Sequence, residues 1–139
     1  MEQMKPSPDK DIERTAQRLA SEAIRNIRLR ELGDLWLKVQ RSMSEARLRS
    51  ESTMKPDTPN DVRIRLTARM LGIRDTFIIL YARTEALLPA HSDPSKSKLK
   101  SEDLGFYESV NDRLHVMDME YRKFMDALPV PYLTDSVKG

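Results

Sequence analysis

The chain has 139 residues, no cysteine and a net charge of +2, which excludes disulfides, thiolate catalysis and cysteine-containing zinc sites. A chain of this length corresponds to one domain. Charged residues make up 33% of the sequence and there are only four glycines, a composition typical of long helices with solvated outer faces.

The start of the chain is polar. Residues 1–8 contain two prolines, and we expect a disordered lead-in there. Residues 1–11 lack the apolar core of a secretory signal. The longest apolar run, residues 77–82, is far too short to cross a membrane. We therefore expect a soluble, intracellular (cytoplasmic) protein that does not contact a membrane.

Residues 10–52 contain no proline and predict one long helix with two successive apolar stripes. The first stripe consists of Ile12, Ala16, Leu19, Ala23 and Ile27. The second consists of Leu29, Leu32, Trp36, Val39, Met43 and Ala46. At about 100° per residue, the two stripes point in nearly opposite directions on an unbroken helix.

Gly33 leaves two interpretations open. A break near Gly33, where glycine costs about 1 kcal/mol relative to alanine, would let both stripes face one core and give a four-helix bundle. The second stripe passes through Gly33 without losing register, so we favour a continuous helix. In that case residues 29–52 lie in the bundle, and residues 10–28 project an apolar face that needs a partner.

Residues 59–88 predict a second helix, which begins after the start signal Thr58-Pro59 and ends before Pro89. One apolar row contains Val62, Leu66, Met70, Ile73, Phe77 and Leu80. A second row, on roughly the opposite side, contains Ile64, Leu71, Ile78 and Ala82. A helix with two apolar rows must be covered from two sides, so we expect this helix to be the central one.

Residues 101–128 predict a third helix, after a loop that starts at Pro89 and before an extended C-terminal tail, residues 129–139. Its apolar residues alternate in steps of three and four, as in a coiled coil: Tyr107, Val110, Leu114, Met117, Tyr121, Phe124 and Leu128. The sequence therefore predicts an all-α domain over residues 9–128, an antiparallel three-helix bundle with an N-terminally extended first helix.

Catalytic chemistry has little support in this sequence. His91 and His115 are the only histidines, and neither has a Glu-x-x-His type of metal-ligand spacing. The glycines are scattered and form no phosphate-binding loop. We expect no catalytic residue, no metal and no cofactor, and therefore no enzyme.

Arginines gather on two helix faces. On the first helix they lie opposite the first apolar stripe, and on the second they share a face with Gly72 and Thr76. The residues are Arg14, Arg18, Arg25, Arg28, Arg65, Arg69 and Arg83. Arginine pairs with phosphates as well as with carboxylates through its planar fork, so these faces are the candidate nucleic-acid contacts.

Two functions follow as hypotheses. The first is a non-enzymatic interaction protein, a homo-oligomer or a subunit or adaptor of a larger complex, which binds its protein partner through the apolar face of residues 10–28. The alternative is a helical nucleic-acid-binding protein that lays its arginine faces along phosphates.

Overall fold

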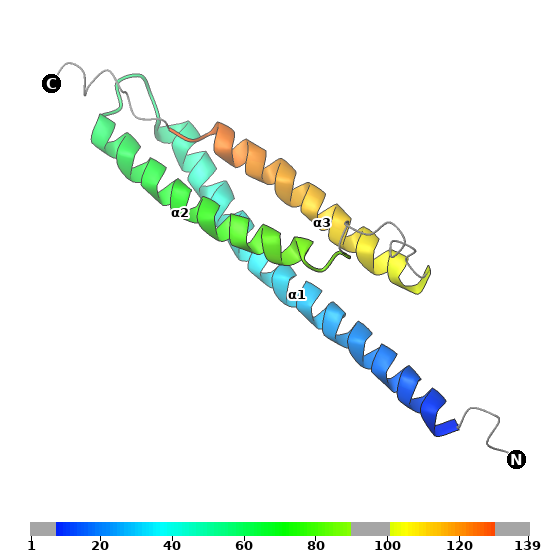
Figure 1. Cartoon of the computed structure of the whole chain (residues 1–139). Coiled ribbons are helices and arrows are strands. Elements are labelled where there is room, and N and C mark those ends of the chain that lie inside the picture. Colours follow the sequence, from blue (N-terminus) through cyan, green and yellow to red (C-terminus); the bar gives the residue numbers. More distant parts are fainter. Residues whose placement is uncertain (1–7, 90–100, 130–139) are drawn as a thin grey trace, which may run out of the picture.

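The structure, a computed structural model, describes residues 8–89 and 101–129, and in this part of the chain it contains three helices (Figure 1). These are α1 (Pro8–Thr53), α2 (Asn60–Glu85) and α3 (Ser101–Asp126). α1 and α3 run in the same direction, and α2 runs antiparallel to both. The predicted all-α, three-helix bundle with an extended first helix is confirmed.

α1 is one continuous helix of 46 residues. It passes through Gly33 without a break, so the four-helix alternative is wrong. Gly33 lies against α3, where its missing side chain makes room for the guanidinium of Arg113. The Nη1 atom of Arg113 donates a hydrogen bond of 2.7 Å to the carbonyl oxygen of Leu29. Gly33 is therefore a packing notch and not a hinge.

The core is built from the second stripe of α1, the first row of α2 and the heptad positions of α3, except for Val62 and Tyr107, which lie outside it. Aromatic side chains from all three helices meet in its middle: the Phe77 ring stacks on Tyr121 at 4.5 Å between centroids and contacts Trp36 edge-on at 6.1 Å. The buried apolar residues are Leu32, Trp36, Val39, Met43, Ala46, Leu66, Met70, Phe77, Leu80, Val110, Leu114, Met117 and Phe124.

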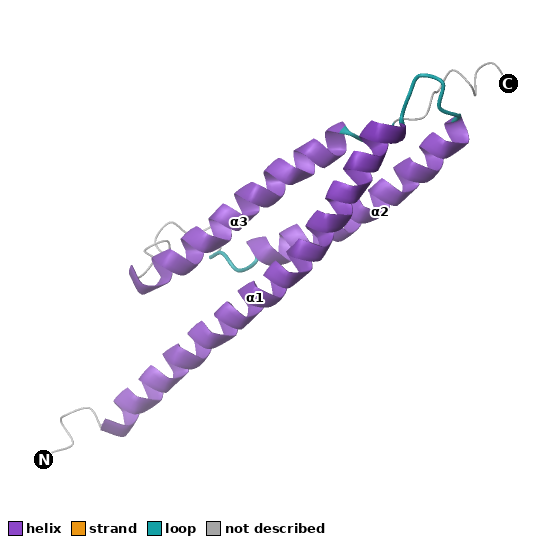
Figure 2. Cartoon of the chain, turned by 180° about the vertical axis from the view of Figure 1, so that it is seen from behind, coloured by secondary structure: helices purple, strands orange, loops and turns teal. Residues whose placement is uncertain are grey.

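The expectation that α2 is covered from two sides is wrong for the described part of the chain. Ile64 and Ile78, from its second apolar row, are 51% and 49% exposed. In a bundle of three helices, both neighbours of α2 lie on the side that faces the core (Figure 2). The periodicity therefore identified two apolar rows correctly, but only one of them has a partner within the described chain.

The turn between α1 and α2 is held by Arg63, which is buried although it is charged. Its guanidinium donates to the carbonyl oxygens of Lys55 (2.7 Å) and Thr58 (3.4 Å). The Thr58 hydroxyl accepts a hydrogen bond from the Lys55 amide at 2.8 Å. Pro59 is the residue that precedes α2, without a side-chain cap, so Thr58 stabilises the turn instead of capping the helix.

Three sequence predictions concern residues that lie largely outside the described ranges: the lead-in (1–8), the loop that follows Pro89, and the C-terminal tail (129–139).

Candidate interaction surfaces

The N-terminal part of α1, residues 8–28, is called the arm below. Residues 9–21 are all exposed, and Figures 1 and 2 show this part of α1 extending past the ends of α2 and α3. On one side of the arm lie the predicted partner-binding residues. Ile12 is 66% exposed, Leu19 54% and Ile27 52%, and Ala16 and Ala23 between them are also exposed.

The arm apolar face points away from the bundle because α1 is continuous. At about 100° per residue, its centre lies about 170° around the helix from the stripe that α1 buries against α2 and α3. The structure therefore brings the five predicted residues together on one solvated face. Ile24, 51% exposed, widens this face along one edge.

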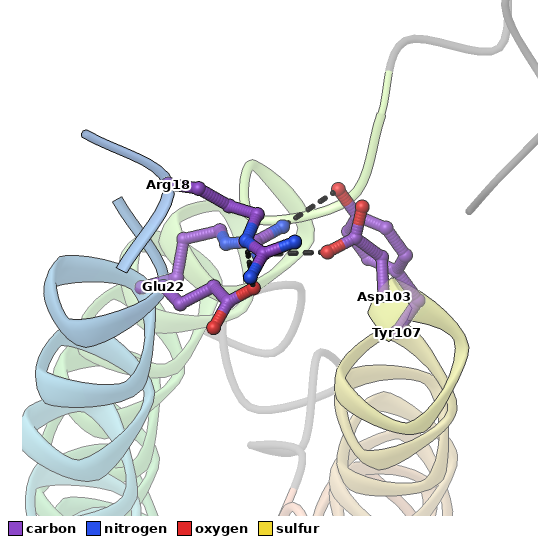
Figure 3. A network of polar contacts seen from close by, with 5 residues as sticks. Arg18, Glu22, Asp103 and Tyr107 are labelled. Atoms are coloured by element: carbon purple, nitrogen blue, oxygen red, sulfur yellow. Dashed lines mark hydrogen bonds and ion pairs between the residues drawn. The ribbon is translucent and has the colours of Figure 1, made fainter. Parts of the chain in front are cut away.

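The base of the arm is fixed to the beginning of α3 by Arg25, whose partners Asp103 and Tyr107 are labelled in Figure 3. Its Nη2 atom lies 2.8 Å from the Asp103 carboxylate, and its Nη1 atom donates a hydrogen bond of 3.3 Å to the Tyr107 hydroxyl. The guanidinium also lies over the Phe106 ring, 5.1 Å from its centroid. The hydrogen bond to Asp103 raises the pKa of Arg25, against the opposing effect of burial.

Arg25 therefore serves as a structural anchor. One turn before it, Arg18 and Glu22 approach each other to 3.9 Å along the same helix (Figure 3). Sequence reasoning placed Arg25 among the candidate phosphate contacts because a single helix wheel does not show that the beginning of α3 reaches this point. The acidic residues Glu102 and Asp103 at the start of this helix are the sequence signal that could have suggested such a pair.

The remaining candidate phosphate contacts lie on two separate elements. Arg14 and Arg28 are exposed on the arm, and Arg69 and Arg83 are exposed on α2. Arg65 pairs with Asp61 one turn earlier, at 3.1 Å. The structure therefore keeps the two arginine groups on different surfaces, and three of the seven candidates, Arg18, Arg25 and Arg65, are paired with carboxylates.

A second apolar surface, which sequence reasoning expected to be buried, lies on the outward side of α2. We call it the α2 outer face; it consists of Ile64, Ala68, Leu71, Ile78 and Ala82. Above Gly72, at its edge, an added Cβ would meet no atom within 4 Å. Asp75 interrupts the row, and its carboxylate lies 3.1 Å from the Arg74 guanidinium.

Within residues 8–89 and 101–129, no group of three histidine, aspartate or glutamate side chains lies close enough to hold a metal ion. A depression of about 270 Å³ between the end of α1 and the start of α2 is lined by residues such as Arg49, Met54 and Leu66, without a carboxylate. None of the described helices combines the length and apolarity needed to cross a membrane.

Comparisons of the chain with protein-family models, with curated proteins and with solved structures found no match. The geometry of these surfaces is therefore the basis for assigning a function.

Proposed function

We propose that the protein is a non-enzymatic helical assembly subunit that docks on a protein partner through the apolar face of the arm. The observation that carries this proposal is the exposure of Ile12, Leu19, Ile24 and Ile27, each more than half exposed, on one side of a preformed helix. A contiguous apolar surface of this kind marks a site of interaction with another protein, and helix-in-groove recognition uses anchors at this spacing.

The rigid base supports the same proposal. Arg25 connects the arm to α3 through an ion pair and an aromatic contact, so the first turns of the apolar face beyond the bundle keep a fixed direction. A helix that is already formed loses less conformational entropy on binding than a segment that must fold.

Site-specific photo-crosslinking in cells tests the proposal. A photo-reactive residue in place of Leu19 should give a crosslinked protein adduct of discrete mass. The matched control replaces Arg14, which lies about 140° around the helix from Leu19, and should give little or none. Equal labelling at both positions, or no adduct at either, would contradict the proposal.

Nucleic-acid binding has less support. Arg25 and Arg65 are engaged by Asp103 and Asp61, and the other candidate arginines do not form one continuous surface. An electrophoretic shift of nonspecific duplex DNA or RNA at low salt, lost with increasing salt, would favour this alternative over the assembly function.

A further inference from the structure

The two exposed apolar faces of this chain share part of a residue template, although Asp75 of α2 stands where the arm has Ala23. Moving 52 positions along the sequence from the arm apolar face leads to the α2 outer face, so that Ile12, Ala16 and Leu19 correspond to Ile64, Ala68 and Leu71. In the same register, Ala20 corresponds to Gly72 and Ile27 to Ile79. Ile79 is 56% exposed. Both faces thus alternate large and small residues with the spacing of a coiled-coil seam.

The opposite sides of the two helices differ completely. Where α2 buries Leu66, Met70 and Phe77 in the core, the arm has Arg14, Arg18 and Arg25. The arm therefore has arginines on the side where α2 has its core residues, with Arg25 bound to Asp103, and apolar residues on its outward side. Packing within the bundle does not account for that template in either helix, because both outward faces point away from the described core.

The charges at the edges of the two faces are inverted. In the shared register, Glu13 and Glu22 of the arm stand where α2 has Arg65 and Arg74. The five basic residues of the arm lie about 140–180° from the centre of its apolar face, and its acidic residues lie closer to that face. Beside the α2 outer face, Arg65, Arg69 and Arg83 share one edge; Arg65 lies 3.1 Å from Asp61, and Arg69 and Arg83 are exposed.

On these grounds we infer that the arm apolar face of one molecule docks on the α2 outer face of a second copy of this chain. This inference rests on the proposed function and names its partner. Pairing arm with α2 matches large and small residues and brings acidic edges against basic ones. Pairing two arms, or two α2 outer faces, would instead bring edges of like charge together, which disfavours these arrangements.

The contact joins two different surfaces, so it is heterologous. Each molecule offers one arm and one α2 outer face, and such contacts continue from one copy to the next unless the rotation closes a ring. The shared template covers 16 residues, about 24 Å of helix. A single helix pair of this length is at the low end of specific interfaces, so we expect association that increases with concentration.

Complementation between two full-length variants tests the inference. Leu19→Asp disables the arm, and Ile78→Asp, at a position 49% exposed, disables the α2 outer face. Light scattering after size exclusion should show that the wild-type mass rises with concentration and that each variant alone stays at the chain mass of 16.1 kDa. Mixing the two variants should restore one productive contact and give a 1:1 complex of about twice that mass.

The control is Leu48→Asp, because Leu48 is 57% exposed and lies outside both faces. This variant should associate like the wild type. A second pair separates charge from folding effects: Glu13→Arg with Glu22→Arg should weaken association, and Arg65→Glu with Arg74→Glu in the mixing partner should restore it. Circular dichroism verifies that every variant keeps its helical content.

Three results would overturn the inference. They are a wild-type chain that stays monomeric up to concentrations on the order of 100 µM, an Ile78→Asp variant that associates as the wild type does, and a variant mixture that remains monomeric. Photo-crosslinking from position 19 tells whether only the α2 outer face is the wrong partner or whether the proposed assembly function is wrong as well. An adduct with a different protein, or with the arm of another copy, leaves the assembly function intact and removes only the α2 outer face as its partner.

Discussion

Arg113 occupies the space that Gly33 leaves on the surface of α1, and its Nη1 atom would lie only 2.8 Å from a Cβ added there. The same atom donates to the carbonyl oxygen of Leu29, which in an α-helix already accepts from the amide of residue 33. The missing side chain exposes this carbonyl, so glycine and arginine act as a pair that joins α1 to α3.

This pairing predicts strong coupling between the two positions. Gly33→Ala alone should change the free energy of unfolding by less than about 1 kcal/mol, because the gain in helix propensity is offset by displacement of Arg113. In an Arg113→Ala background the same substitution should stabilise by about 1 kcal/mol. Urea unfolding of the four proteins of this double-mutant cycle measures the difference. If the two substitutions change the unfolding free energy additively, Arg113 does not depend on the space left by Gly33.

Removing the Asp103 charge should loosen the base of the arm. The Arg25 and Asp103 side chains are 27% and 22% exposed, and a partly exposed ion pair of this kind contributes about 1 kcal/mol or less. We expect Asp103→Asn to increase hydrogen exchange of backbone amides in residues 20–28 and to leave those near Trp36 unchanged. Asp112→Asn, at an exposed position on the same helix, is the control. Equal exchange in both variants would show that Arg25 does not anchor the arm.

The raised pKa of Tyr81 leads us to expect that the free energy of unfolding decreases at alkaline pH. Burial, and then the carboxylates of Glu85 and Asp118, raise the pKa of its phenol above the ordinary value. The unfolded chain therefore loses this proton at lower pH than the folded one. The contribution is fully present below about pH 10, the ordinary tyrosine pKa, and is lost as the pH rises through the folded value. Above about pH 10, the unfolding free energy of Tyr81→Phe should fall less steeply with pH than that of the wild type. An equally steep fall would show that Tyr81 is not the source of the alkaline loss.

Gly72→Ala should stabilise the isolated molecule. Gly72 lies inside α2, no glycine in the described chain has a positive φ, and an added Cβ would meet no atom within 4 Å. Alanine should therefore raise the free energy of unfolding by about 0.5–1 kcal/mol through helix propensity alone. Thermal and urea unfolding at low protein concentration measure this gain. A loss of stability would reveal a contact over Gly72.

Much of the fold could be predicted from the sequence because each buried row repeats in steps of three and four. The stripe through Trp36, the row through Phe77 and the heptads through Phe124 all form the core. The prediction was wrong for Ile64 and Ile78, since periodicity identifies an apolar face but not the molecule that covers it. Arg63 was missed as well, because its burial depends on carbonyl oxygens that only the folded turn brings together.

For the candidate surfaces too, the sequence predicted the features of a single helix but not the contacts between helices. The exposed row through Leu19 follows from a helix that continues past Gly33, a feature that the register of the second stripe indicated. The role of Arg25 depends on where the first turn of α3 lies relative to α1, and a helix wheel contains no such information. Contacts between distant segments, here residues 25 and 103, are set by the packing of the whole bundle.

The unbroken course of α1 has a thermodynamic consequence for the arm. Starting a helix is unfavourable because the first turn fixes several residues for a single hydrogen bond, whereas each further residue adds a bond of its own. Within α1, the first turns form in the part that packs against α2 and α3, and the helix only has to propagate from there toward Pro8. An isolated peptide of the arm, with about 20 residues, would have to nucleate by itself and would be only marginally helical in water. The bundle therefore serves as the nucleus that keeps the arm ready to bind in helical form.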